Sequence, residues 1–414
     1  MGPGRAKRVE RDRYEDVTTI QHRRHRPDYI LFIIVLILLI IGVAVVYAIG
    51  PALGLSNNVS SNFYSSRQII AIVLSLIAFF VTSRIPLSNW RQWHKPLLIV
   101  AALATLVAFV MPANPQYPAH RWIRLGSFSF QSVELLKFAV LIWLAGFLSD
   151  RISSRLITDS KSTLRPLLIT IVVIGVFVAG VQSDFGSTVV MMAMIAAMAF
   201  IAGMPFKRLI LVGGILAIGG VLAISAVPYR RERLMAFMHP TSNCQGSDYQ
   251  ACQALISVGS GGVIGLGLGR SVQAYGYLPE AANDSIFAIY AEKFGFIGVT
   301  VLLALFLVLF ARLKNIAMRA PDNFSRLFVI GVLAWLSVQS MINIGAMIGL
   351  LPLKGITLPF VSYGGTSVVF VMAAMGVVFQ ISRYASYSKE TDGRRDARED
   401  RVDWRRDQRR AYHA

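Results

Sequence analysis

The feature that most constrains this chain is a series of apolar runs, each about 17 to 25 residues long, the length a helix needs to cross roughly 30 Å of hydrocarbon. The clearest run, residues 29–49, contains no charged side chain. Of the 414 residues, 55% are hydrophobic and only 15% are charged, which is far more apolar than a soluble domain. We therefore expect an all-α integral membrane protein.

Ten such runs predict ten transmembrane helices. Several are short, so their ends are approximate. The first 28 residues are too polar for a cleavable signal peptide, and the first run is long enough to remain in the membrane. The predicted helices cover residues 29–49, 68–83, 96–111, 132–148, 167–182, 187–202, 208–227, 286–311, 326–348 and 365–383.

The basic residues predict the orientation. Most of the 41 lysines and arginines lie in the two tails and in alternate short loops. Because basic residues accumulate on the cytoplasmic side, both termini are expected inside the cell. The same distribution argues against nucleic acid binding, despite a net charge of +19. A membrane domain at residues 29–385 is thus flanked by a basic cytoplasmic tail, 1–28, and by a tail at 386–414 that we expect to be disordered.

This topology leaves two substantial external segments, residues 112–131 and 228–285. The second holds a glycine cluster at 259–269. Long ordered loops are usually functional, and we expect part of this one to return toward the membrane, where its backbone must line protein or a water-filled cavity. Its cysteines, Cys244 and Cys252, are too few for a disulfide scaffold or a zinc site, but they could form one disulfide in an oxidising compartment.

Two charged residues interrupt the fourth apolar run. Glu134 and Lys137 are three positions apart, which places them on one helical face where they can neutralise each other. Either charge alone would be costly in lipid, so both should face the interior of the bundle. A structural ion pair is the simpler interpretation, and a role in shaping a site for a lipid headgroup is the alternative.

Two aspartates come directly before predicted helices. Asp184 precedes the sixth helix and Asp284 the eighth. Aspartate is a favoured N-cap, so capping is the simplest interpretation of both from the pattern alone. A role in catalysis is the alternative for Asp284.

Several basic residues fall outside the cell, against the usual bias. Arginine forks suit phosphate oxygens, so a phosphate-bearing substrate is an alternative to a solvated or headgroup-bound surface. No metal-ligand spacing is present, and the glycine cluster is not followed by the Lys-Ser/Thr of a phosphate-binding loop. The external basic residues are Arg121, Arg124, Arg230, Arg231, Arg233, Arg270 and Lys354.

Four short motifs stand out along the chain. They are Arg121–Gly126 with Gln131–Lys137, Gln182–Ser187, Tyr277–Ala281 with Asp284, and Leu358–Ser367. In these motifs the chain resembles the SEDS family (shape, elongation, division and sporulation), whose corresponding patterns are R-W-x-x-L-G with Q-P-S-E-x-x-K, Q-P-D-L-G-T, Y-L-P-E-A-H-T-D-F-I-F-A and L-P-F-I-S-Y-G-G-S-S. The resemblance extends from the first predicted helix to about residue 385 and includes the ten-helix layout.

The chain departs from these patterns at a few positions. Ser132-Val133 stands for Pro-Ser, Ser183 for Pro, and the residues around Asp284 differ from His-Thr-Asp-Phe. Two further stretches, Tyr229–Leu234 and Lys354–Pro359, are more similar to the division branch of the family than to its elongation branch.

The resemblance implies a peptidoglycan polymerase of the bacterial cytoplasmic membrane, acting at the division septum. Its substrate would be lipid II, a disaccharide-pentapeptide on undecaprenyl pyrophosphate, and its reaction would invert the anomeric carbon. It further implies that Asp284 is the general base, with Mg²⁺ or Mn²⁺ as a candidate cation, no metal site assigned, and no organic cofactor. Candidate substrate contacts are Arg121, Arg230, Arg231, Lys354, Glu280 and Ser362, with Glu134, Lys137 and Asp184 shaping the site.

The family also implies partners, namely a class B penicillin-binding protein transpeptidase and other division proteins. Three other functions remain open from the residues: a flippase for lipid II or another polyprenyl lipid, an elongation-type polymerase, and a non-catalytic scaffold. A flippase needs polar groups that reach both leaflets. Here the unusual polar residues gather toward the outer face, which favours external chemistry.

Overall fold

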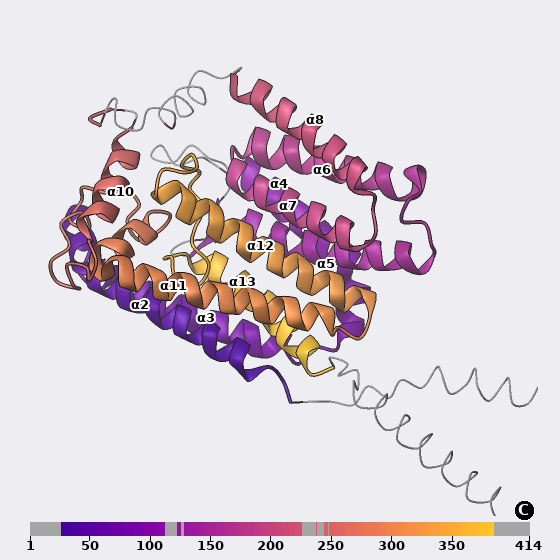
Figure 1. Ribbon diagram of the computed structural model, residues 1–414, viewed down its shortest axis with the longest axis horizontal. Helices are drawn as coiled ribbons and strands as arrows, with labels where there is room; N and C mark the ends of the chain where they lie inside the picture. Colours follow the sequence, from indigo (N-terminus) through magenta and orange to yellow (C-terminus); the bar gives the residue numbers. More distant parts are fainter. Residues whose placement is uncertain are drawn as a thin grey trace, which may run out of the picture.

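The computed structural model of the protein describes residues 26–111, 122–125, 128–225, 237, 244–246 and 248–384. The described chain is a bundle of long helices (Figure 1). Most of the N-terminal tail, the tail at 386–414, and the predicted contacts Arg121, Arg230 and Arg231 lie outside these residues.

Each of the ten predicted ranges coincides with a helix. Within the described residues, eight helices are long and apolar enough to cross a membrane, and Phe185–Ile201 is a shorter apolar helix. The helical membrane class is therefore confirmed, whereas ten crossings remain a prediction. The helices are α2 (Tyr29–Ser56), α3 (Phe63–Thr82), α4 (Leu87–Val110), α5 (Ser132–Ser153), α6 (Arg165–Ile174, with π-helical turns at Ser160–Leu164 and Gly175–Val181), α7 (Phe185–Ile201), α8 (Phe206–Ser225), α11 (Ile286–Met318), α12 (Asn323–Met347) and α13 (Gly365–Ser382).

The most buried helices, α5, α12 and α13, occupy the centre of the bundle. In the most apolar 18-residue stretch of α5, 83% is buried, whereas in that of α4 only 17% is buried. The apolar residues of α4 therefore mostly face outward, as they would toward lipid. Small residues let neighbouring helices approach closely. At Gly376 of α13, an added Cβ would lie 2.1 Å from the Thr82 hydroxyl of α3. A side chain at this position would push the two helices apart.

The two ends of the bundle can be told apart by their contacts. The Asp28 N–H, just before α2, donates to the Ser382 hydroxyl at the end of α13, 3.0 Å away. The Asp28 carboxylate also pairs with Arg312, near the end of α11, at 2.7 Å. Helix α2 therefore starts where α13 ends, as an even number of crossings from α2 to α13 requires. The start of α11 lies at the opposite end (Figure 1).

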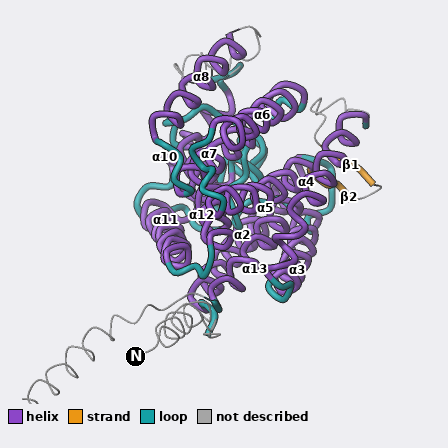
Figure 2. The backbone as a smooth tube through the Cα atoms, turned by 90° about the vertical axis from the view of Figure 1, so that its right-hand side faces the viewer, coloured by secondary structure: helices purple, strands orange, loops and turns teal. Residues whose placement is uncertain are grey.

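The predicted external segments contain structure of their own. Residues 122–125 (β1, Trp122–Leu125) and 128–131 (β2, Phe128–Gln131) form a small antiparallel hairpin that the sequence analysis did not predict. Figure 2 shows this hairpin at the periphery of the bundle, beside α4. The longer segment contains α10 (Tyr249–Ser260), which packs on α11.

The glycine cluster packs against a break inside α11. Helical geometry fails at Gly295 (φ 62°, ψ −164°), which leaves backbone groups without partners within the helix. Residues 262–267 supply those partners through four backbone hydrogen bonds with residues 292–297. An added Cβ at Gly265 would lie 2.2 Å from the Lys293 carbonyl oxygen, so only glycine permits this approach. The loop thus satisfies irregular backbone within a candidate membrane helix.

Candidate active site

Asp284 lies in a turn that three hydrogen bonds hold in place. The carbonyl groups of residues 282–284 accept, in order, from the Tyr363 N–H (2.8 Å), the Ser362 hydroxyl (2.6 Å) and the Asn343 side-chain amide (2.7 Å). Three consecutive carbonyl groups of one turn are therefore bound by α12 and by the segment that follows it. This dense bonding fixes the backbone that carries the Asp284 carboxylate.

The carboxylate of Asp284 lies against the segment after α12. It is partly buried, and an added Cβ at Gly355 would be 3.6 Å from its Oδ2 atom. Gly355 has a left-handed backbone (φ 64°), and Lys354 precedes it directly. The residue at the N-cap of α11 is Ser285, so the simpler interpretation of Asp284 as the cap of this helix is wrong. The tertiary contacts of the turn, rather than helix capping, determine where Asp284 lies.

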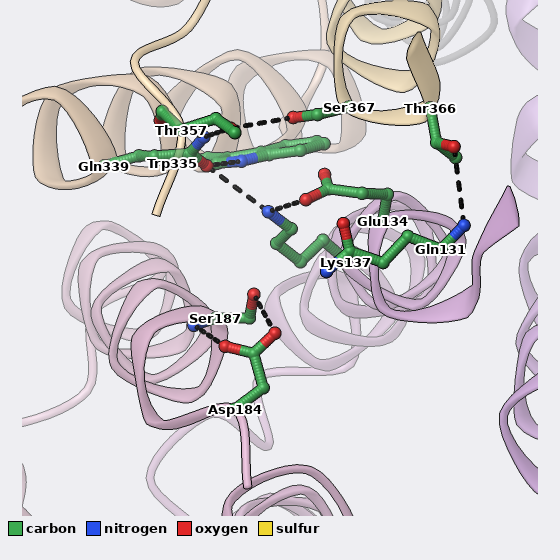
Figure 3. A network of polar contacts seen from close by, with 10 residues as sticks. All are labelled: Gln131, Glu134, Lys137, Asp184, Ser187, Trp335, Gln339, Thr357, Thr366 and Ser367. Atoms are coloured by element: carbon green, nitrogen blue, oxygen red, sulfur yellow. Dashed lines mark hydrogen bonds and ion pairs between the residues drawn. The ribbon is translucent and has the colours of Figure 1, made fainter. Parts of the chain in front are cut away.

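Asp184, in contrast, is a helix cap as predicted. It is buried, its Oδ1 accepts from the Ser187 N–H at 2.9 Å, and its Oδ2 accepts from the Ser187 hydroxyl at 3.0 Å. Figure 3 shows these two contacts at the start of α7. The next residue, Phe185, places its ring 5.6 Å from the Lys354 ammonium nitrogen. The start of α7 and the segment carrying Lys354 are therefore neighbours.

The predicted ion pair in α5 is present. The Lys137 Nζ lies 2.8 Å from Glu134 Oε1, and both side chains are almost fully buried (Figure 3). Lys137 also donates to Gln339 Oε1 (3.3 Å), which accepts a second hydrogen bond from the Trp335 indole N–H (2.8 Å). The amide group of Gln339 in turn donates to the Thr357 carbonyl oxygen at 2.9 Å. The pair is thus joined through α12 to the segment beside Asp284.

Two predicted substrate contacts lie at this turn: Glu280 belongs to it, and Ser362 belongs to the segment that binds it. Ser362 is buried, and its hydroxyl accepts from the Leu358 N–H (2.7 Å) while it donates to Asn283. Glu280 is exposed, adopts a left-handed backbone (φ 52°) and accepts a hydrogen bond from the Asn283 side chain. Ser362 therefore shapes the turn from inside the protein, while Glu280 lies at its surface. Their contacts with substrate stay predictions.

An arginine outside the predicted basic set borders this turn. The Arg67 guanidinium lies 4.2 Å from the centre of the Phe63 ring and hydrogen-bonds to Tyr363. Burial raises the pKa of the Tyr363 phenol, and the positive charge of Arg67 opposes that rise. Tyr363 therefore stays neutral at physiological pH. Of the other predicted basic residues, Arg124 and Arg270 are exposed and Lys354 is partly buried.

The predicted disulfide forms beside the same turn. Cys244 and Cys252 are joined, which closes the chain around the start of α10. From α10, Gln250 donates to the Ser285 hydroxyl at 3.1 Å, and the Ser257 hydroxyl donates to the Ala288 carbonyl oxygen at 3.0 Å. The disulfide therefore helps to order a helix that contacts the residue next to Asp284.

The donors for a metal ion are sparse around Asp284. Where the chain is described, no group of three or more His, Cys, Asp and Glu side chains is placed to hold a metal ion. A cation at this turn would draw its other ligands from oxygen groups such as backbone carbonyls, substrate or water. The candidate role of Mg²⁺ or Mn²⁺ stays a prediction.

Comparison with known proteins identifies the family to which this chain belongs. Residues 28–387 match the family model described as "Cell cycle protein", which groups FtsW, RodA and SpoVE. The chain belongs to the SEDS family. It is 37% identical to stage V sporulation protein E of Bacillus subtilis over 367 residues, which cover 88% of this chain and 99% of that protein. It is 36% identical to the probable peptidoglycan glycosyltransferase FtsW of Coxiella burnetii over 323 residues, which cover 77% of this chain and 86% of that one.

Solved structures share the SEDS fold. A chain in a structure entitled "Structural coordination of polymerization and crosslinking by a peptidoglycan synthase complex" matches with a TM-score of 0.69 at 25% identity, covering 86% of this chain and 98% of that one. The rod shape determining protein RodA of Thermus thermophilus matches with a TM-score of 0.62 at 24% identity, covering 87% and 98%. The second likeness supports the fold alone.

The SEDS motifs, which are far apart in the sequence, meet at one end of the bundle. Gln182 donates to the Ser132 hydroxyl at 3.4 Å, which links the second motif to the first. The N–H of Gln131 donates to the Thr366 hydroxyl at 3.4 Å, which links the first to the fourth. The fourth motif binds the Asp284 turn through Ser362. The four motifs therefore form one connected cluster that includes the Asp284 turn.

The sequence analysis missed two polar residues of this SEDS site. Gln339 and Asn343 lie inside the ninth predicted helix and are buried. Their spacing of four residues, which puts both amides on one helical face, was the available signal. Polar side chains within a membrane helix usually face the bundle interior and bind a partner.

Proposed function

We propose that this protein is a peptidoglycan glycosyltransferase that polymerises lipid II at the outer face of the bacterial cytoplasmic membrane. The names of its FtsW relatives support the activity. One observation carries the site: three consecutive carbonyl groups of the Asp284 turn accept hydrogen bonds from α12 and the segment after it, at the end of the bundle away from Asp28 and Ser382. With both termini in the cytoplasm, as the basic residues favour, that end faces outward.

In the proposed reaction, the Asp284 carboxylate takes the proton from the 4-hydroxyl of the incoming sugar. The hydroxyl oxygen then forms a bond to the anomeric carbon of the growing chain, and the bond from that carbon to the diphosphate breaks. Attack opposite the leaving group inverts the anomeric configuration. A positioned base of this kind contributes a factor of about 10²–10⁴ to the rate.

The leaving diphosphate gains negative charge, which nearby cations stabilise. Lys354 is the predicted contact within the described chain, and its segment adjoins Asp284 through Gly355. A divalent cation would supply the same stabilisation when bound. The Glu134–Lys137 pair contributes no net charge, so we assign it to the shape of the site.

Replacing Asp284 tests the proposal. The variants Asp284→Ala and Asp284→Asn should lose at least about 10²-fold in glycan-strand formation from purified lipid II, with unchanged membrane level and helix content. Asp150→Asn is the control. Asp150 is an exposed carboxylate that pairs with Arg91, and it lies near the C-terminal end of α5, whereas the motif residues of α5 lie near its start. Wild-type turnover by Asp284→Ala would remove this residue from the mechanism. Translocation of fluorescent lipid II without strand formation would identify a flippase instead.

The division role and the partner are finer parts of the proposal. The FtsW relatives support septal synthesis, and the structural match to a chain of a peptidoglycan synthase complex supports a class B penicillin-binding protein as partner. Depletion should then give filamentous cells, and a fluorescent fusion should gather at the septum. Rounded cells with a lateral signal would support an elongation-type polymerase instead. Because a partner-dependent enzyme can be inactive alone, strand formation should be assayed with and without that transpeptidase.

A further inference from the structure

Asn343 joins two separate segments of the candidate site through one side-chain atom. Its Nδ2 donates to the carbonyl oxygens of Asp284 and Ile356, each at 2.7 Å. One acceptor belongs to the turn before α11 and the other to the segment after α12. Asn343 itself is only 2% exposed. Both protons of one amide group therefore tie the catalytic turn to the neighbouring segment.

The second acceptor lies close to the carboxylate. Gly355, which borders Asp284 Oδ2, directly precedes Ile356. The Asn343 amide thus binds the main chain of Asp284. It also binds the main chain of Ile356, which is one residue from Gly355, the residue next to the Asp284 carboxylate. Asn343 therefore helps to set the distance between the carboxylate and the Lys354 segment, together with the bonds from Ser362 and Tyr363.

Gln339, one helical turn earlier, holds the next carbonyl group. It donates to the Thr357 oxygen at 2.9 Å, so two successive carbonyl groups are bound by two amides on one face of α12. The two amides differ in their other contacts. Gln339 bonds to Lys137 of the α5 ion pair, whereas Asn343 bonds to Asp284. Of these two amides, only Asn343 is therefore expected to act directly on the position of the base.

The chemistry of the site requires an amide at this position. A short neutral group that donates twice is found only in asparagine and glutamine, since hydroxyl groups donate once. Both partners are carbonyl oxygens, so the nitrogen must face them. The Asn343 oxygen is buried without a hydrogen-bond partner in the described part of the chain. Such an oxygen is costly, and the two donated bonds offset that cost.

We propose that Asn343 is a positioning residue for Asp284. It sets where the carboxylate stands relative to the sugar hydroxyl by tying the turn to the segment after α12. This inference rests on the proposed function, because it assigns Asn343 a role in the same reaction. A displacement of about 1 Å at a catalytic group can cost about 10²-fold in rate, so loss of the tether should act on chemistry rather than on substrate binding.

The test compares Asn343→Asp, Asn343→Ser and Ser340→Ala in the full-length chain, reconstituted with lipid II and normalised to folded protein. Aspartate keeps the size of asparagine but not the two donors, and serine keeps one donor. Ser340 is buried on the same helix, with a hydroxyl that has no partner among the residues described. We expect kcat to fall about 10²-fold in Asn343→Asp with KM within about twofold, a smaller fall in Asn343→Ser, and wild-type values in Ser340→Ala.

Two results would overturn the inference. One is a wild-type kcat per folded molecule in Asn343→Asp, or in Asn343→Ser should the first variant fail to fold. The other is an equal loss in Ser340→Ala, which would indicate general loosening of α12. The proposed function is judged separately. If the wild type forms strands and Asp284→Ala does not, while Asn343→Asp is normal, only the role of Asn343 fails; if the wild type forms none, both fail.

Discussion

Two acid–base pairs lie in helices of this bundle, and they are neutralised in opposite ways. Glu134 and Lys137 in α5 are three residues apart and bind each other at 2.8 Å. Glu292 and Lys293 in α11 are adjacent in sequence, and both are also buried. Neighbouring residues on a helix point in different directions, so the second two cannot pair in the same way.

The charges of α11 are instead satisfied by the external loop. Glu292 accepts hydrogen bonds from the Ser271 hydroxyl (2.5 Å) and from the N–H groups of the next two residues (2.8 and 3.2 Å). Lys293 donates to the Leu268 carbonyl oxygen at 2.7 Å. The α5 pair is therefore complete within one helix, while the α11 charges depend on a loop and hold that loop in place.

The largest effect is expected from breaking the α5 pair on one side. Lys137→Met leaves the Glu134 carboxylate buried without its cation and should cost about 3–5 kcal/mol of stability. The double variant Glu134→Leu/Lys137→Met should recover most of that loss, because no charge is left behind. Unfolding in mixed detergent micelles measures both. Equal losses in the single and double variants would mean that the two charges do not depend on each other.

The next effect is expected at Glu292. Glu292→Gln keeps the shape but removes the charge that three donors bind, and should cost about 2–3 kcal/mol. Hydrogen exchange should rise in residues 259–273, where the loop is anchored, more than in α5. Asp150→Asn, at an exposed carboxylate, serves as the control. An unchanged exchange rate in the loop would contradict its dependence on Glu292.

A smaller effect is expected at Lys293. Lys293→Met removes one hydrogen bond to the loop and should cost about 1–2 kcal/mol. Combined with Glu292→Gln, the two losses should be less strongly coupled than those at Glu134 and Lys137, because Glu292 and Lys293 bind different groups of the loop. Strong coupling between Glu292 and Lys293 would erase the difference between the two pairs.

The smallest effect is expected at Asp184, the carboxylate that caps α7. Asp184→Ala removes the cap from α7 and should cost about 1 kcal/mol, while Asp184→Asn should cost less because its oxygen still accepts from Ser187. Thermal unfolding of the two variants measures the difference. A loss above about 3 kcal/mol in both would assign Asp184 a larger role than capping.

The predictions that held concern features set by nearby residues. Each predicted helix depends on its own apolar run, the Glu134–Lys137 pair on a spacing of three, and the Asp184 cap on a residue three positions away. The Cys244–Cys252 bridge likewise joins residues only eight apart. These patterns can be read from a short window because the interacting groups lie within it.

The site around Asp284 could not be predicted from such windows. The capping interpretation failed there because the turn is bound by Asn343, Ser362 and Tyr363, which lie about 60 to 80 residues further along the chain. The local preference of aspartate for the N-cap position is overridden when tertiary hydrogen bonds determine the backbone conformation. Glu292 was overlooked for a related reason, since its partners come from a loop and not from its own helix.

The sequence by itself determined that this is a helical membrane protein with its charges at particular helical positions, because hydrophobicity and spacing are local properties of the chain. Only the tertiary structure decided which two carbonyl groups Asn343 binds, where the glycine cluster meets the break in α11, and how four distant motifs are connected to the Asp284 turn. Those contacts depend on how closely the helices and loops pack, and that packing is set by the whole bundle at once.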